Sequence, residues 1–232
     1  SIPAATHINV VATTFDYSQK SNLGTIRTGS YLSQASMLVY DDILRFQRSS
    51  AGYTGGLTAE KVDAFNYNQF EGNILWFMDE LVGMESDWIK TASASSTTAY
   101  GYVQFTEDSV ETAVNRYIGH LERFNERKDI DRGWEPYSIK KHETLPIPEW
   151  LTTLKNSTKT HKEKLDALTY DEMLALAFVH LHSKKSKDSN FVLLAEGDIY
   201  ASKEIYKNNH HTNPDAATLT RLEGFFPWRK QN

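Results

Sequence analysis

The chain has 232 residues, a formal net charge of −5 and a pI near 5.9, and this length suits one domain with a sizeable core. The acidic balance argues against nucleic acid as a main partner, and no run is long and apolar enough to span a membrane. The absence of cysteine excludes disulfides, thiolate nucleophiles and thiolate metal ligands. Aromatic residues are plentiful, which argues against a disordered chain.

Apolar residues recur at the helical period through much of the chain, so we predict a mainly α-helical fold. Residues 1–28 are rich in Thr, Ser and Asn and are expected to form an extended arm. The expected helices cover 30–47, 59–83, 106–124, 149–162, 170–182 and parts of 191–206, with a last helix between Pro214 and Phe225. The expected loops cover 49–56, 90–99, 126–148 and 183–190, where glycine, proline, charged or small polar residues gather.

Two of these helices carry clear start signals. Thr106 is followed by two acidic residues, which suit the positive end of a helix dipole. Thr169 and Glu172 have the spacing of a capping box. The residues that follow it, 173–181, are almost continuously apolar, so this helix is expected to be buried on most sides.

The stretch 70–105 carries the strongest functional signal. An apolar stripe runs along the predicted helix through 82, and the next position on that face is Glu85. Burial and the negative end of the helix would both disfavour the ionised form and raise the pKa of this carboxyl. Such an acid suits protonation of a glycosidic oxygen. The alternative is that Glu85 ends the helix facing solvent, and spacing alone does not choose between the two.

The segment AYGYVQF at 99–105 adds groups that suit a sugar ligand. Gly101 permits a positive φ or the close approach of backbone to ligand. Gln104 offers both a donor and an acceptor, while Tyr100 and Tyr102 offer rings for pyranose faces. Ser86 could hydrogen-bond to Glu85 or to a substrate. The alternative reading is a simple turn between structural elements.

The pair Glu85-Ser86, the small polar loop and the segment YGYVQF at 100–105 together resemble the core of soluble (SLT-type) lysozyme-like lytic transglycosylases, especially those carried by bacteriophages. The resemblance is specific over 84–105 and loose over the rest of 58–215. It implies a lysozyme-like (SLT/goose-type) helical catalytic domain over 58–232, preceded by an arm and a helix over 1–57.

The resemblance also implies the chemistry. Glu85 would be the sole acid/base in cleavage of the MurNAc-GlcNAc linkage of peptidoglycan, giving 1,6-anhydro ends without metal or cofactor. Ser86, Tyr100, Gly101, Tyr102 and Gln104 would line the glycan site. A third family motif should fall near 174–182, where Phe178 or His180 replaces the expected tyrosine and its polar neighbour. The protein would act on the cell wall or periplasm, from a phage virion or after release, with other virion proteins as possible partners.

Other readings stay open at this point. A metal site is not expected, because His180 and His182 lie two apart and face different sides of a helix, and His210 and His211 suit a solvated loop. A muramidase or chitosanase-type hydrolase would need a second carboxylate. Asp87, the nearest one in sequence, could serve only if the chain bent there. A non-catalytic structural or wall-binding protein is the third alternative.

Overall fold

The computed structural model describes residues 31–49, 67–126, 144–184, 206 and 214–224, and these are mainly helical, as the periodicity predicted. The helices are α2 (Tyr31–Ser49), α4 (Tyr67–Ser86), α5 (Glu107–Glu126), α6 (Glu149–Asn156), α7 (His161–Asp166), α8 (Tyr170–Lys184) and α11 (Ala216–Glu223). The predicted arm over 1–28, the start of the helix expected from 59 and nearly all of 191–206 lie outside the described residues. No described helix is long and apolar enough to cross a bilayer.

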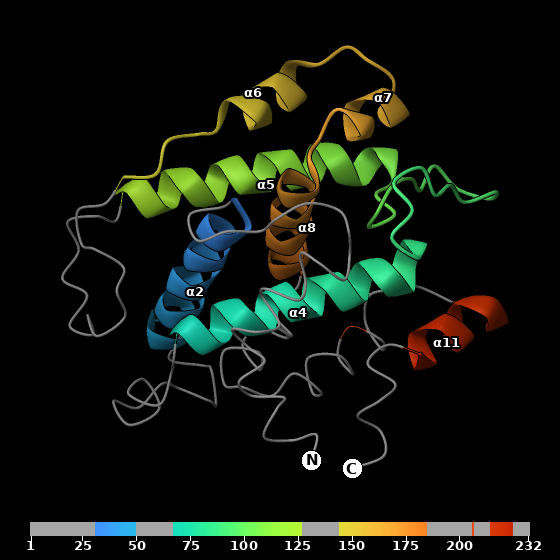
Figure 1. Cartoon of the computed structure of the whole chain (residues 1–232). Coiled ribbons are helices and arrows are strands. Elements are labelled where there is room, and N and C mark those ends of the chain that lie inside the picture. Colours follow the sequence, from blue (N-terminus) through green and yellow to red (C-terminus); the bar gives the residue numbers. More distant parts are fainter. Residues whose placement is uncertain (1–30, 50–66, 127–143, 185–205, 207–213, 225–232) are drawn as a thin grey trace, which may run out of the picture.

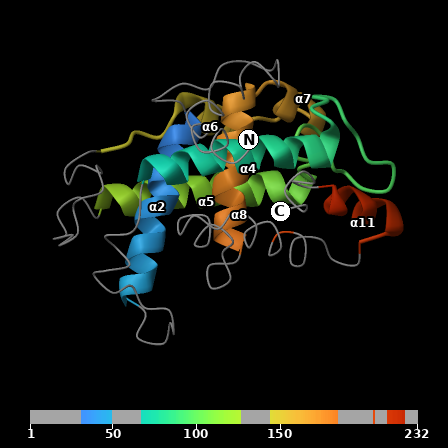
Figure 2. The ribbon, with the colours of Figure 1, turned by 60° about the horizontal axis from the view of Figure 1, so that its bottom comes forward.

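Helix α8 lies at the centre of the described residues, with α2, α4 and α5 around it (Figures 1 and 2). Every residue from Glu172 to His180 is buried, as its continuous apolar sequence predicted. Its contacts with α2 and α5 are the most extensive between any two described elements. The predicted capping box is confirmed, because Thr169 Oγ1 accepts from the Glu172 amide at 3.2 Å and the Glu172 carboxylate accepts from the Thr169 amide at 3.1 Å.

Helix α2 is joined to α8 at its first turn. The backbone amides of Tyr31 and Leu32 donate to the two carboxylate oxygens of Asp171, at 2.9 and 3.0 Å. The first amides of a helix have no partner within the helix, so an acidic side chain from a neighbouring helix satisfies them here. Helix α2, which falls in the predicted arm and helix over 1–57, therefore packs in the same core as α8.

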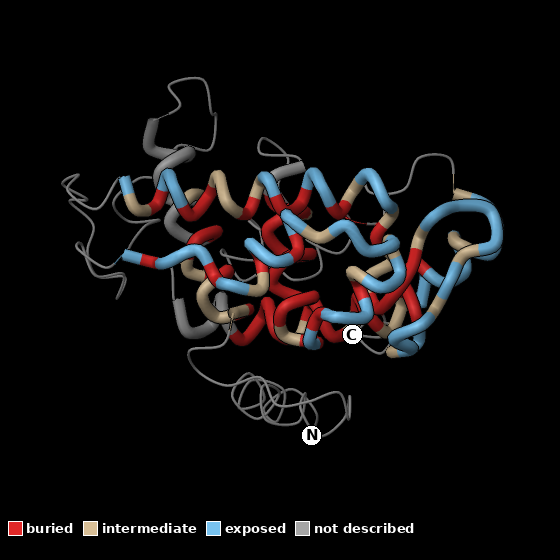
Figure 3. The backbone as a smooth tube through the Cα atoms, turned by 90° about the horizontal axis from the view of Figure 1, so that it is seen from above, coloured by how far each residue is buried: buried red, intermediate tan, exposed pale blue. Residues whose placement is uncertain are grey.

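Helix α5 turns one apolar face inward and a polar face outward, whereas α4 has no exposed residue from Gly72 to Ser86. Figure 3 shows the buried, half-buried and exposed positions along the described chain. On α5 the buried residues recur every three or four positions: Val110, Ala113, Val114, Tyr117, His120, Leu121 and Phe124. The predicted loop over 90–99 is confirmed and is mostly exposed. The last helix is confirmed as α11, with the Asp215 carboxylate accepting from the Thr218 amide at 2.7 Å.

The single helix predicted over 149–162 is wrong, because the chain forms two short helices there. Helix α6 ends at Asn156, and Ser157 is extended with φ −68° and ψ 134°. Helix α7 then starts with a new capping box between Thr160 and Glu163. Short hydroxyl side chains offer the backbone local hydrogen bonds that compete with a continuous helix, and the run of them over 157–160 explains the break.

Replacement of Asp171 by alanine is expected to lower the free energy of unfolding by about 1–2 kcal/mol, because the Tyr31 and Leu32 amides at the start of α2 lose their acceptor. Urea denaturation followed by circular dichroism measures this. The control is Glu111→Ala, which removes an exposed acidic side chain of α5 and should change the free energy by less than about 0.5 kcal/mol. Equal effects of the two substitutions would contradict the capping role of Asp171.

Candidate active site

Glu85 lies in the last turn of α4 with only 5% of its surface exposed. It takes the position after Leu81 and Val82 on the buried face of the helix, so the reading that placed it toward solvent is wrong. The Tyr206 hydroxyl donates to Glu85 Oε1 at 2.6 Å. The Arg221 guanidinium, from α11, lies 3.9 Å from Glu85 Oε2. Two residues far along the chain thus address the two oxygens of one buried carboxyl.

Tyr206 holds its proton strongly. Burial raises its pKa well above the ordinary value of 10, and the neighbouring Glu85 charge and hydrogen bond raise it further, while Arg221 opposes them. Its ring also meets the edge of Phe77 on α4, with centroids 6.2 Å apart and planes at 83°. The hydroxyl therefore remains a donor across the working pH range, and Glu85 Oε1 is held as its acceptor.

The Arg221 contact is weaker by its geometry. The distance of 3.9 Å is beyond hydrogen-bond range, and half of the Arg221 side chain is exposed to solvent. Its charge still favours a negative charge on Glu85, because a carboxylate gains from a nearby cation. Helix α11, which carries Arg221, lies beside the end of α4 (Figure 1).

The chain turns sharply at the end of α4, directly after Ser86. Helix α4 continues past the predicted end at Gly83 to Ser86, and Asp87 and Trp88 then adopt positive φ values of 52° and 58°. Both lie in the left-handed region that side chains other than glycine seldom adopt. A bend therefore exists at the place where a hydrolase using Asp87 would require one, and Asp87 itself is exposed.

Trp88 folds back over the last turns of α4. Its indole nitrogen donates to Asp79 Oδ1 at 2.9 Å, and a Cβ added to Gly83 would lie 2.5 Å from the Trp88 ring. Tyr170, at the start of α8, donates to the same Asp79 oxygen at 3.5 Å. A glycine therefore stands at position 83, within α4, because any larger side chain would overlap the indole. The sequence instead suggested that Gly83 ends the helix.

Ser86 is buried, and its hydroxyl donates to the Val82 carbonyl at 3.0 Å. That bond within α4 uses the proton which a substrate role would require. The hydroxyl oxygen keeps acceptor capacity. The described contacts of Ser86 therefore favour a part in ending the helix over direct contact with a sugar.

The turn predicted around Gly101, called here the glycine turn, is present. Gly101 has φ +86°, and a Cβ added there would meet no atom closer than 3.7 Å, so glycine is required by its backbone conformation and not by lack of space. The Gly101 amide donates to the Ala92 carbonyl at 2.9 Å. Gln104 Nε2 donates to the carbonyls of Ala92 and Gly101, at 3.0 and 2.9 Å. The Gln104 side chain thus holds the turn closed.

Tyr100 and Tyr102 face inward from this turn, and both are buried. The Tyr100 hydroxyl donates to Asp166 Oδ1 at 2.9 Å, and the Lys162 ammonium lies 5.4 Å from its ring centroid. The Tyr102 ring meets the Tyr170 ring edge-on at 5.0 Å. Both rings tie the turn to α7 and α8, which leaves little of their faces for a pyranose ring.

The candidates on α8 differ from each other. Phe178 has no exposed surface and is a core residue, so the structure gives it no face for a substrate. The His180 ring lies 5.8 Å from the ring of Phe105, the last residue of the YGYVQF segment. His161 Nε2 lies 2.9 Å from the Phe105 carbonyl oxygen. Phe178 is therefore a core residue, whereas the buried His180 packs against the end of the segment at 100–105.

Asp79 connects the end of α4 to the glycine turn. Trp88 and Tyr170 both donate to Asp79, and Tyr170 contacts Tyr102 in the glycine turn. Sequence reasoning missed Tyr206 and Arg221 altogether. No motif or spacing marks either of them, because their partner Glu85 is more than 100 residues away in the chain.

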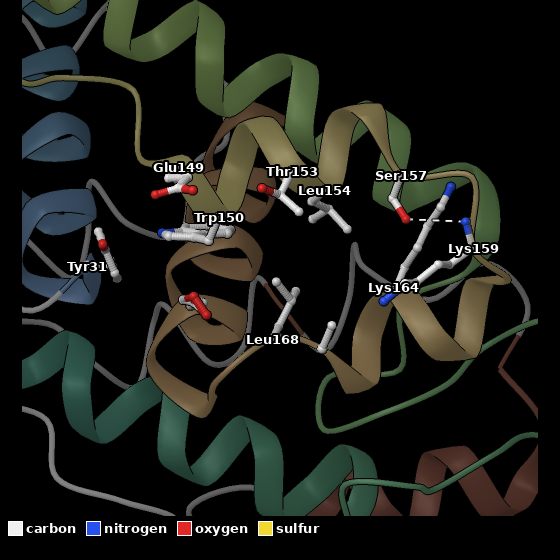
Figure 4. A pocket seen from close by; sticks show the side chains of 11 residues that line it. Tyr31, Glu149, Trp150, Thr153, Leu154, Ser157, Lys159, Lys164 and Leu168 are labelled. Carbon is white, nitrogen blue, oxygen red and sulfur yellow. Dashed lines mark hydrogen bonds between the residues drawn. The ribbon is translucent and has the colours of Figure 1, made fainter.

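A pocket of about 410 Å³ lies between α6, α7, the first turn of α8 and the start of α2 (Figure 4). It is lined in part by Trp150, Lys159 and Lys164, and none of the predicted site residues is among its lining side chains. Its position therefore gives no support to an extended binding site around Glu85.

Comparisons with protein-family models, with curated proteins and with solved structures gave no match. The functional argument therefore depends on the residues and their geometry.

Replacement of Gly83 by alanine is expected to lower the free energy of unfolding by about 1–3 kcal/mol, because the added methyl group overlaps the Trp88 ring. Gly119→Ala is the control. At Gly119 the nearest atom is the flexible end of Arg123 at 3.3 Å, and alanine should raise helix stability by about 0.5–1 kcal/mol. Thermal denaturation measures both. A stabilised Gly83→Ala protein would mean that Trp88 does not rest on α4.

Replacement of Tyr206 by phenylalanine is expected to cost about 1–3 kcal/mol at neutral pH, because the buried Glu85 loses a donor. Tyr117→Phe is the control, since the buried Tyr117 hydroxyl has no hydrogen-bond partner in the described part of the chain. It should change stability by less than about 0.5 kcal/mol.

The Tyr206→Phe substitution also tests the pKa of Tyr206. Because this pKa is raised in the folded state, its contribution is fully present below the unfolded value of about 10 and is lost as pH rises above it. Unfolding free energy measured between neutral pH and pH ~11 should fall less steeply in Tyr206→Phe than in the wild type. An unchanged slope would contradict the buried, proton-holding state of Tyr206.

Proposed function

We propose that this chain cleaves the glycan strands of bacterial peptidoglycan as a lytic transglycosylase, with Glu85 as its single acid/base. The observation that carries the proposal is the buried Glu85 at the end of an apolar helix, with Tyr206 donating to Oε1 at 2.6 Å. A buried carboxyl whose orientation is fixed by a neighbour is the kind of group that protonates a glycosidic oxygen.

The proposed reaction balances with Glu85 alone. The protonated carboxyl gives its proton to the oxygen that links C1 of N-acetylmuramic acid to N-acetylglucosamine, and the C1–O bond breaks. The sugar's own C6 hydroxyl then bonds to C1 and returns its proton to the Glu85 carboxylate. The product is a 1,6-anhydro end, the carboxyl is regenerated, and neither water nor a second carboxylate takes part.

Tyr206 and Arg221 would stabilise the ionised Glu85 carboxylate that forms when the proton leaves. A hydrogen bond to an ionised carboxylate is stronger than one to a neutral carboxyl, so the Tyr206 bond gains strength as the proton leaves. Arg221 adds attraction at the other oxygen, reduced by its solvent exposure. Both effects lower the energy of the state that follows proton transfer.

The glycine turn is proposed to present the substrate side of the site. In the family that the chain resembles, a G-x-x-Q motif lines the glycan cleft, and here Gln104 fixes the backbone of that turn by bonding to Ala92 and Gly101. We therefore assign Gln104 as a positioning residue. Tyr100 and Tyr102 would position the same turn through their contacts with Asp166 on α7 and Tyr170 on α8.

The finer features of the resemblance belong to the same proposal. The helical core is proposed to be a lysozyme-like (SLT/goose-type) domain, to which α2 also belongs through Asp171. The enzyme is proposed to act on the cell wall, either from a phage virion or after its release.

A hydrolase of muramidase type is the second candidate, because the bend at Asp87 and Trp88 changes the direction of the chain just after Glu85. An exposed carboxylate two positions along the chain from the acid could activate water. The two candidates differ in their products: anhydro ends from the transglycosylase, and reducing ends from the hydrolase.

Digestion of purified peptidoglycan followed by mass spectrometry tests both candidates. Wild-type protein should release anhydro-muropeptides, and Glu85→Gln should slow release by about 10²–10⁴-fold because the acid/base is lost. The glutamine keeps an oxygen that can accept from Tyr206, so its thermal denaturation should stay close to that of the wild type.

Asp87→Asn is the matched control and should keep full activity. Reducing-end products that disappear in Asp87→Asn would instead assign the hydrolase. An intact substrate with folded wild-type protein would favour a non-catalytic wall-binding role, and full activity of Glu85→Gln would contradict the site assignment.

A further inference from the structure

Asp42, His120 and His182 form a cluster that is separate from the Glu85 site. They come from three helices, α2, α5 and α8 respectively. Each residue offers one ligand atom, and the three atoms lie within 4.8 Å of one another. His182 Nε2 lies 2.7 Å from Asp42 Oδ2, and the two imidazole rings have centroids 5.6 Å apart at 46°.

We propose that this cluster, called here the His-Asp cluster, binds a divalent transition-metal ion, with zinc as the ion that its donor set fits best. Two imidazoles and one carboxylate are donors that zinc accepts readily, and three protein ligands leave a fourth position for water or another donor. Both histidines are buried, whereas Asp42 keeps about a quarter of its side chain exposed. The cluster therefore has shielded ligands and an edge that reaches solvent.

The distances are compatible with this ion after small side-chain movements. Zinc–nitrogen and zinc–oxygen bonds of about 2.0–2.2 Å place tetrahedral ligand atoms roughly 3.3–3.5 Å apart. The His182–Asp42 pair at 2.7 Å must open by roughly 0.6 Å to reach that range. The other separations, at most 4.8 Å, must close by up to about 1.5 Å. The proposal requires shifts of this size from rotation of the three side chains.

A His182–Asp42 hydrogen bond alone would account for only part of this arrangement. It explains why an imidazole and a carboxylate meet, but it does not include His120, whose side chain reaches the same point from α5 and lies within ligand reach of both. A bound ion accounts for all three residues. It would also link α2 to α5 and α8 toward the end of α8, whereas Asp171 links α2 to the start of α8.

Zinc titration of chelator-treated full-length protein by calorimetry tests the proposal. We expect roughly one zinc ion per chain, and thermal denaturation should shift to higher temperature when zinc is added and return when a chelator is added. His120→Gln, His182→Gln and Asp42→Asn should each weaken binding by at least about 100-fold, as expected for loss of a ligand. His161→Gln is the control, because His161 lies outside the cluster and bonds to Phe105.

Asp42→Asn separates the metal site from the hydrogen-bond reading. Asparagine can still accept a hydrogen bond from His182, so a structural bond alone predicts little change in stability and no response to zinc in either protein. The proposal predicts that the zinc-dependent stabilisation present in the wild type disappears in this variant. Absence of zinc binding by the wild type, or equal binding by all the variants, would overturn the proposal. These outcomes do not depend on cell-wall cleavage by Glu85.

Discussion

The fold depends on one constraint: α8 is buried on every side, so other helices must surround it. Residues 172–180 are all buried, and a helix with such a sequence cannot remain at a surface. Helices α2 and α5 cover most of it. Its polar groups lie near its ends, where Asp171 receives the first amides of α2 and His182 meets Asp42. The central helix therefore sets both the packing and the places where charged groups are held inside.

The candidate active site is also held in place by α8. Tyr170, in the first turn of α8, contacts both Asp79 on α4 and Tyr102 in the glycine turn. The turn at Asp87 and Trp88 is held against α4 by the bond from Trp88 to Asp79. The end of α4 is thus fixed on several sides, which keeps the Glu85 carboxyl in one position. Proton transfer by a general acid requires such fixed geometry.

Much of the fold follows from the sequence alone. Apolar patterns together with capping and turn signals predicted α2, α5, α8 and α11, because both kinds of signal are local properties of the sequence. Glu85 was found for the same reason, as a carboxylate on an apolar stripe, and Gly101 as a turn residue. The break between α6 and α7 was missed because short local hydrogen bonds at Ser157 and Thr160 outweigh a modest helical pattern. Gly83 was misread because the indole that rests on it is a tertiary neighbour.

Tertiary structure decided which groups meet. Nothing in the spacing of Tyr206 or Arg221 indicates that they lie against Glu85. The spacing of His180 and His182 on one helix likewise indicates nothing about partners from other helices. Its polar neighbours, Asp42 and His120, come from two other helices. Periodicity reports which face of a helix is buried, but not what the opposing surface offers. The sequence by itself determined most of the helices and placed Glu85 on an apolar stripe, because both are local properties. Only the packing of the helices decided that this acid is buried and which groups lie against it and against His182.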